Sequence, residues 1–404
     1  MTIGLEDVRA AAARIEGHLS RTPVVSAARL GDMAGCRIHL KLESQHATGS
    51  FKERGALNKL LSLGEAERTA GVIAMSAGNH AQAVACHATR LGIRSTIVMP
   101  SFTPFTKVER TESLGAKVEL HGDTLSDAAA FAHDLAARQG LTFVHPYDDP
   151  FVAAGQGTAA LEFLAEVPDL DTLVIPIGGG GLIAGMATAA KALNPAIQII
   201  GVQCALYPAM AQALAGQPIV CGGATIAEGI AVKAPGGVTL PIVRALVDDV
   251  IEVGETRLEE AVYRLSTMQK LVAEGAGGAG LAAVLDNPAR FAGRKVGIVI
   301  SGGNIDSRIL AQVLMRGLVY EGRIVRLRIG ITDAPGALAR VTRLLGEAGA
   351  NIVEVYHQRL FHNVPVKMAE VDVVLETRDQ SHVQALMVRM RDAGFPTALM
   401  TDVS

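Results

Sequence analysis

The sequence contains no tryptophan, and aromatic residues make up only 4% of its 404 residues. Such a chain offers few of the flat side chains on which unpaired nucleic-acid bases stack. Its 37 lysine and arginine residues are balanced by 40 aspartate and glutamate residues, without the basic cluster that a phosphate backbone attracts. We therefore expect no nucleic-acid partner.

Long apolar runs are also missing, because no segment approaches the ~18 apolar residues that cross a membrane. The first residues, MTIGLEDVRA, lack the basic and apolar stretches of a secretion signal. The four cysteines are scattered and form no CxxC pair, which argues against both a disulfide framework and a thiolate zinc site. These absences predict a cytoplasmic protein with no membrane partner.

Glycine is abundant, with 43 residues, about 11% against roughly 7% in average proteins. Many glycines follow short β-branched runs, and helical apolar spacing separates these runs from one another. The predicted strands are 37–43, 71–76, 95–100, 116–122, 141–146, 172–177, 197–203 and 295–301. This alternation predicts an α/β fold with a parallel sheet covered on both faces.

The pattern changes after residue 321. Strands are predicted at 323–331, 351–360, 366–377 and 395–400, with helices from about 337 and 382. This βαββαβ order is that of a ferredoxin-like unit. We expect two domains, residues 1–321 and 322–404.

The segment 50–56, SFKERGA, places Lys52 at the predicted start of a helix. The positive end of the helix dipole disfavours a charged amine there. Lys52 is therefore suited to be the neutral nucleophile of a Schiff base. The alternative is a surface lysine paired with Glu53.

The segment GGGGL, residues 178–182, follows a predicted buried strand and opens a helix. Successive glycine N–H groups and the helix N-terminus favour a bound phosphate. The segment has neither the Walker pattern nor GxGxxG spacing, and a flexible connector is the alternative.

Two more polar loops, SAGNH at 76–80 and SGGN at 301–304, also end predicted strands. Open α/β sheets bind ligands beyond the carboxyl ends of their strands. N–H groups at 77–80 are suited to hold a carboxylate. The alternatives are that Asn79 caps a helix and that His80 is structural.

In this order, SFKERGA, SAGNH, GGGGL and SGGN are similar to the motifs of fold-type II pyridoxal-phosphate enzymes, in particular the threonine dehydratases (threonine ammonia-lyases). The resemblance covers residues 1–321 and implies a tryptophan synthase β-like fold with two subdomains. The smaller subdomain, about 45–147, is inserted in the larger. The C-terminal unit, with GITDAPGAL, resembles an ACT domain, which gives a catabolic-type architecture.

The resemblance also implies residue roles around pyridoxal 5'-phosphate. Lys52 forms the aldimine, Phe51 packs against the ring, Gly229 lies near its other face, Asn79 bonds the 3'-oxygen, and Ser301 faces the pyridine nitrogen. The phosphate is cradled by Gly178, Gly179, Gly180, Gly181 and Leu182. The substrate carboxylate is held by the loop Ser76, Ala77, Gly78, Asn79 and His80.

The expected reaction is dehydration and deamination of L-threonine to 2-oxobutanoate and ammonia by β-elimination, with serine giving pyruvate as a secondary activity. Lys52 is the expected general base. A serine hydroxyl does not keep the pyridine nitrogen protonated as an aspartate would, which favours elimination over transamination. Whether the pathway is threonine breakdown or isoleucine biosynthesis is left open.

Three other functions stay open. Serine racemase relatives carry a serine where this chain has Ala77, and a cation site whose counterpart here, 203–207, lacks carboxylates. We therefore expect feeble racemisation and no metal. A 3-hydroxyaspartate dehydratase has the same motifs, and a non-catalytic amino-acid sensor would use the ACT unit alone.

In the ACT-like unit, positions that resemble the effector-binding residues of that family are Thr332, Asp333, Pro335, Gly336, Ala337, Leu338, Asn351 and Ile352. A branched-chain amino acid is the expected effector. Such sites lie between paired domains, so a homodimer or homotetramer is expected. The alternative is that this unit serves oligomerisation only.

Overall fold

The structure is a computed structural model that describes residues 3–358 and 365–400. The chain divides into two compact units, residues 1–305 and 306–404. The division lies before the expected boundary at 321/322, because helix α15 (Ser307–Tyr320) packs with β11 (Ile324–Thr332) of the second unit. Each unit is described separately below.

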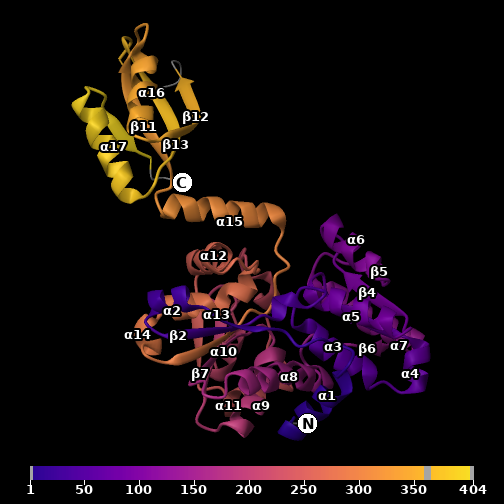
Figure 1. Cartoon of the computed structure of the whole chain (residues 1–404). Coiled ribbons are helices and arrows are strands. Elements are labelled where there is room, and N and C mark those ends of the chain that lie inside the picture. The colour runs from indigo at the N-terminus through magenta and orange to yellow at the C-terminus, as the bar shows by residue number, and fades with distance from the viewer. Residues whose placement is uncertain (1–2, 359–364, 401–404) are drawn as a thin grey trace. The chain divides into compact units, whose positions relative to one another are not determined.

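A six-stranded sheet forms the centre of the N-terminal unit (Figure 1). Its strands, in spatial order, are β1 (Val24–Ser26), β2 (Arg37–Lys41), β10 (Lys295–Val299), β7 (Thr172–Pro176), β8 (Gln198–Cys204) and β9 (Asp249–Val253). Only β1 runs antiparallel to its neighbour. The parallel core confirms the predicted α/β fold, and the two edge strands β1 and β9 were not predicted.

Helices cover both faces of this sheet, and each face has its own apolar core. One face carries α2 (Ala28–Ala34), α12 (Glu255–Arg264), α13 (Gly275–Asp286) and α14 (Pro288–Phe291). The other carries α1 (Leu5–Ile15), α8 (Pro150–Glu166), α9 (Gly181–Leu193) and α11 (Thr239–Leu246). Figure 1 shows α12 and α13 on one side of β2 and α8, α9 and α11 on the other.

Helices α8 and α9 approach each other closely through glycine. A Cβ on Gly185 would lie 2.0 Å from the carbonyl oxygen of Ala153, and one on Gly157 would lie 2.7 Å from the carbonyl oxygen of Gly185. Only glycine permits backbone contact at these distances. The contact fixes α9, whose first two residues are the last two of the segment 178–182, called the glycine segment below.

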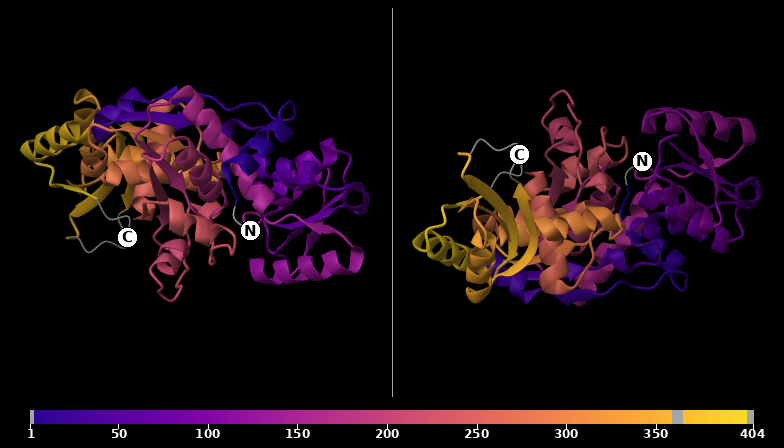
Figure 2. Two further views of the ribbon diagram at one scale, coloured as in Figure 1. Left: turned by 90° about the horizontal axis from the view of Figure 1, so that it is seen from below. Right: turned by 90° about the horizontal axis from the view of Figure 1, so that it is seen from above.

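A second, wholly parallel sheet lies between β2 and β7 in the sequence. Its order is β5 (Lys117–Leu120), β4 (Ser95–Met99), β3 (Val72–Met75) and β6 (Thr142–Phe143). It is covered by α3 (Lys52–Leu61) and α5 (Asn79–Arg90) on one face and α7 (Leu125–Gln139) on the other. Figure 2 shows this purple segment as a lobe beside the rest of the unit. It lies within the expected insertion, residues 45–147.

Shorter elements complete the N-terminal unit. They are η1 (Glu43–Gln45), α4 (Glu65–Ala70), α6 (Phe105–Ser113), α10 (Ala209–Leu214), η2 (Glu228–Ile230) and the π-helical turn η3 (Leu265–Gln269). Among the described residues, no helix is both long and apolar enough to cross a membrane.

The C-terminal unit contains the predicted ferredoxin-like order. Its antiparallel sheet has the order β12 (Asn351–Gln358), β13 (Met368–Glu376), β11 and β14 (Thr397–Leu399). Helices α16 (Ala337–Glu347) and α17 (Gln380–Asp392) pack their apolar residues against it. The last two residues of the predicted strand 351–360 lie outside the described residues.

Candidate functional site

The polar loops identified in the sequence meet at the carboxyl ends of β2, β3, β7 and β10. The Phe51 N–H donates to the Ser301 carbonyl at 3.0 Å, and Ser50 forms a β-bridge with Gly302. The Asn79 amide reaches Glu274 at 2.7 Å. A Cβ on Gly178 would lie 3.4 Å from the Gly229 carbonyl oxygen. These contacts join segments from both sheets in one site.

Lys52 is the first residue of α3, as its sequence context predicted. Its Nζ donates to the Pro146 carbonyl at 2.7 Å and lies 5.0 Å from the centroid of the Phe51 ring. Burial lowers the pKa of Lys52 to about 8, although the charge of Glu274 acts in the opposite direction. A large neutral fraction is therefore present near pH 8, which suits a nucleophile or base.

The alternative for Lys52, a pair with Glu53, is wrong. The Glu53 carboxylate instead accepts hydrogen bonds from His87 Nε2 at 2.9 Å and from the Thr48 N–H. Burial alone would raise the pKa of Glu53, but the His87 and Thr48 hydrogen bonds bring it down to about 2. Glu53 therefore anchors the start of α3 and leaves the Lys52 amine unengaged by it.

Arg54, two residues after Lys52, is fully buried. Its guanidinium donates to both oxygens of Glu43 at 2.7 and 2.8 Å and to both oxygens of Glu162 at 2.7 Å. Thr158 accepts a further bond at 3.0 Å, and Lys41 Nζ donates to Glu162 at 2.6 Å. These bonds tie the first turn of α3 to η1 and α8, so they fix the position of the Lys52 backbone.

The glycine segment joins β7 to α9. Gly180 is the N-cap of α9 and has φ +99°. Residues other than glycine rarely adopt this backbone conformation. A Cβ on Gly179 would lie 2.3 Å from the Tyr147 ring. The Gly179 carbonyl accepts a hydrogen bond from Thr239 Oγ1 at 2.6 Å. The first N–H groups of α9 have no acceptor within the helix, an arrangement that is suited to bind an anion.

The loop 76–80 joins β3 to α5. Asn79 is the first residue of α5, and no side chain caps this helix, so the capping alternative is wrong. His80 is 2% exposed, and its Nε2 bonds the Val144 carbonyl at 2.8 Å. Burial lowers the pKa of His80 to about 3. This geometry favours a structural role for the His80 ring. Ser76, Ala77 and Gly78 form the connection between β3 and α5.

No role was predicted from the sequence for two residues of the site, Glu274 and Asn304. Glu274 Oε1 accepts from Asn79 Nδ2, and Asn304 Nδ2 donates to Asn79 Oδ1, both at 2.7 Å. Burial raises the pKa of Glu274 to about 7. Asn304 ends the SGGN motif and Glu274 lies in the glycine-rich segment 272–280, but no local pattern indicates that both side chains bond Asn79.

In the C-terminal unit, Gly336 has φ +84° and is the N-cap of α16. Asn351 begins β12 and donates to Glu376 at 3.3 Å. Leu338 and Ile352 both pack against the apolar core of the unit. The other predicted effector positions, Thr332, Asp333, Pro335 and Ala337, lie in the end of β11, the following turn and the start of α16.

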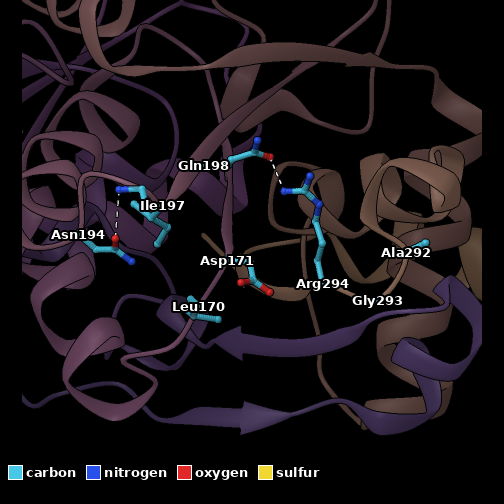
Figure 3. A pocket seen from close by; sticks show the side chains of 9 residues that line it. Leu170, Asp171, Asn194, Ile197, Gln198, Ala292, Gly293 and Arg294 are labelled. Carbon is cyan, nitrogen blue, oxygen red and sulfur yellow. Dashed lines mark hydrogen bonds between the residues drawn. The ribbon is translucent and has the colours of Figure 1, made fainter.

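A pocket of about 460 Å³ lies elsewhere, at the amino ends of β7, β8 and β10 (Figure 3). Arg294 donates to Gln198 there at 2.6 Å, and Asp171 lies nearby. Because parallel strands have their carboxyl ends at the opposite edge, this pocket is separate from the Lys52 site.

The chain is similar to known proteins over most of its length. Residues 15–302 match the family of pyridoxal-phosphate-dependent enzymes, and residues 321–393 match the ACT domain. The L-threonine ammonia-lyase of Thermotoga maritima is 43% identical over 386 residues, which cover 95% of this chain and 96% of that protein.

Two solved structures are similar to more than three quarters of the chain. Maize serine racemase has a TM-score of 0.74 and 36% identity, and the match covers 80% of this chain and 100% of that one. The processed form of threonine deaminase isoform 2 from Solanum lycopersicum has a TM-score of 0.72 and 32% identity, with 77% and 86% covered.

Proposed function

Because the chain belongs to the family of pyridoxal-phosphate-dependent enzymes and ends in an ACT domain, we propose that it is a threonine ammonia-lyase. It converts L-threonine to 2-oxobutanoate and ammonia, and L-serine more slowly to pyruvate. The observation that carries this proposal is the Lys52 amine, held at the start of α3 with a lowered pKa, in the same site as the glycine segment.

The residues of the site fit pyridoxal 5'-phosphate. The glycine segment provides N–H groups and a helix N-terminus for the phosphate, and a Cβ at Gly179 would clash with the Tyr147 ring at 2.3 Å. Phe51 offers an aromatic face beside Lys52. Gly229 lies in η2, and Leu182 is the second residue of α9. In this proposal Asn79 bonds the 3'-oxygen and Ser301 faces the pyridine nitrogen. When bound, the cofactor supplies an electron sink for the substrate Cα.

The residues of the chain carry out the remaining tasks. The loop 76–80 holds the substrate carboxylate through its N–H groups. The neutral Lys52 amine, oriented by the Pro146 carbonyl, accepts the proton from Cα. Loss of the β-hydroxyl as water gives aminocrotonate, which reacts with water to give 2-oxobutanoate and ammonia.

The test is the release of 2-oxo acid by purified, cofactor-loaded protein from L-threonine, L-serine and 3-hydroxyaspartate. Threonine is expected to react fastest. Turnover of hydroxyaspartate alone would refute the substrate assignment, and bound cofactor without any turnover would favour the non-catalytic sensor. Lys52→Ala is expected to abolish turnover and the absorbance band of the bound cofactor. Lys191→Ala, which removes an amine of α9 paired with Asp248, is the matched control.

Serine racemisation is the second candidate, favoured by the similarity to maize serine racemase. Ala77 has no hydroxyl to exchange a proton on the second face of Cα. We therefore expect little D-serine when L-serine is recovered from the same reaction and separated by chiral chromatography. Rapid formation of D-serine would contradict this expectation.

For the ACT domain we propose binding of a branched-chain amino acid by the loop 332–338 and the start of β12, in a homodimer or homotetramer in the cytoplasm. Isoleucine or valine is expected to shift the threonine saturation curve. Asn351→Ala is expected to remove the shift and keep the activity measured without effector. Sedimentation gives the oligomeric state, and an unshifted curve would favour a purely oligomerising role.

A further inference from the structure

Three side chains from separate segments form a hydrogen-bonded chain in the site. Asn79 begins α5, Glu274 is the residue before α13, and Asn304 follows β10. Asn79 Nδ2 donates to Glu274 Oε1 at 2.7 Å, while Asn79 Oδ1 accepts from Asn304 Nδ2 at 2.7 Å. Asn304 Nδ2 also donates to the Thr48 carbonyl at 2.7 Å. The Asn79 amide is therefore engaged on both sides.

This chain fixes which way the Asn79 amide faces. The Thr48 carbonyl accepts only, so it sets Asn304 Nδ2 as the donor on that side. Asn304 then requires the oxygen of Asn79 in front of it, and Glu274 accepts from the nitrogen. A flipped Asn79 amide would place its oxygen against the Glu274 carboxylate and its N–H groups against the N–H groups of Asn304. The second N–H of Asn79 Nδ2 is consequently held in one direction.

The Glu274 carboxyl is closely surrounded. A Cβ on Gly302 would lie 2.3 Å from Glu274 Oε1, and one on Gly229 would lie 3.2 Å from it. The Glu274 N–H donates to the Gly302 carbonyl at 3.1 Å. Glycines at 229 and 302 thus leave room for a carboxyl that reaches Asn79, which makes its placement specific.

We propose that Glu274 and Asn304 are positioning residues that act through Asn79, by aiming its free N–H at the 3'-oxygen of the cofactor. This rests on the proposed function only in that pyridoxal 5'-phosphate occupies the site. Neither residue needs to touch the substrate. Their loss is expected to affect cofactor binding and the electronic environment of the ring before it affects any step of turnover.

The test measures the dissociation constant of pyridoxal 5'-phosphate from the apoprotein and the absorbance maximum of the bound cofactor. Glu274→Ala and Asn304→Ala are each expected to weaken binding about 3- to 10-fold, the effect of one hydrogen bond, and to shift the maximum. Glu274→Gln keeps an acceptor oxygen and is expected to restore both. Glu252→Ala, on the edge strand β9, removes an exposed carboxylate away from the site and serves as control.

A double-mutant cycle with Asn79→Ala decides whether the two residues act through Asn79. In the Asn79→Ala background, Glu274→Ala and Asn304→Ala are expected to cause no further loss of cofactor binding. Full additive losses, or an unchanged dissociation constant and spectrum in the single variants, would overturn the proposal. If the predicted cofactor effects occur but threonine releases no 2-oxobutanoate, the proposed function fails while this inference stands.

Discussion

Removal of the Arg54 guanidinium by Arg54→Met is expected to be among the most destabilising single changes in the N-terminal unit. The side chain is fully buried and bonds both oxygens of Glu43 and both oxygens of Glu162. Methionine fills much of the space but offers no donor. Glu162 keeps Lys41 at 2.6 Å, whereas Glu43, which is fully buried, loses its guanidinium partner.

The magnitude follows from the loss of one partner of a buried ion pair, which costs about 3–5 kcal/mol. The free energy of unfolding of a domain is about 5–15 kcal/mol, so the variant loses a large share of its stability. Burial alone would raise the pKa of Glu43, but Arg54 and His46 hold it well below its usual range. Without Arg54 the carboxyl is expected to take up a proton, which limits the loss at acid pH.

The assay is urea unfolding of the apoprotein followed by circular dichroism between pH 4 and pH 7. In the wild type, ionised Glu43 contributes stability above its ordinary pKa, and this contribution disappears only as pH falls through the lowered folded value. In Arg54→Met, the buried carboxylate becomes costly as pH rises. The difference between the two proteins should therefore grow from pH 4 to pH 7.

The control is Arg257→Met, because Arg257 is about half exposed and pairs with Glu260 and Asp286 at the surface. Its loss is expected to cost less than about 1 kcal/mol. An Arg54→Met loss as small as that of the control at pH 7, or a difference that shrinks as pH rises, would refute the reasoning.

Three further outcomes are expected. Capture of pyridoxal 5'-phosphate by the apoprotein, followed by stopped-flow absorbance, should accelerate with a midpoint near pH 8, because burial lowers the pKa of Lys52 to about 8; a midpoint near 10.5 would contradict this. Gly179→Ala should weaken cofactor binding at least about tenfold, because its Cβ would lie 2.3 Å from the Tyr147 ring. Gly254→Ala is the control, because its Cβ would have no heavy atom within 4 Å, and this variant should bind the cofactor normally. Gly185→Ala, whose Cβ meets a carbonyl of α8 at 2.0 Å, should lower the unfolding free energy by about 1–3 kcal/mol, and an unchanged urea midpoint would count against the tight contact.

The buried strands of both sheets were predictable because runs of β-branched residues indicate strands. The exceptions are β1, which is three residues long, and β9, an edge strand with exposed positions. Because few of their side chains are buried, these two strands have only a weak apolar pattern in the sequence. The expected boundary at 321/322 lies beside the start of the ACT-domain match at residue 321, whereas the compact C-terminal unit begins at residue 306 because α15 packs with β11.

The site was predictable as a set of loops but not as a set of contacts. Lys52 and the glycine segment stand out because a strand end and a helix start flank each of them. The partners of Asn79 lie 195 and 225 residues away, and no local pattern links such positions. Likewise, Arg54 looks like an ordinary helix residue until Glu162 is brought to it by the packing of α3 on α8.

The strand order of the large sheet also has a consequence for synthesis on the ribosome. Strand β2 has only β1 and β10 as neighbours, and β10 is the last strand of the unit to be made. About 250 residues separate them, which at roughly 5–20 residues per second is about 10–50 s of translation. The small sheet has all its strands once residue 143 has emerged. The antiparallel pair of β1 and β2, which are joined through α2, keeps an open strand edge during this time, and we expect this edge to need protection from pairing with other chains.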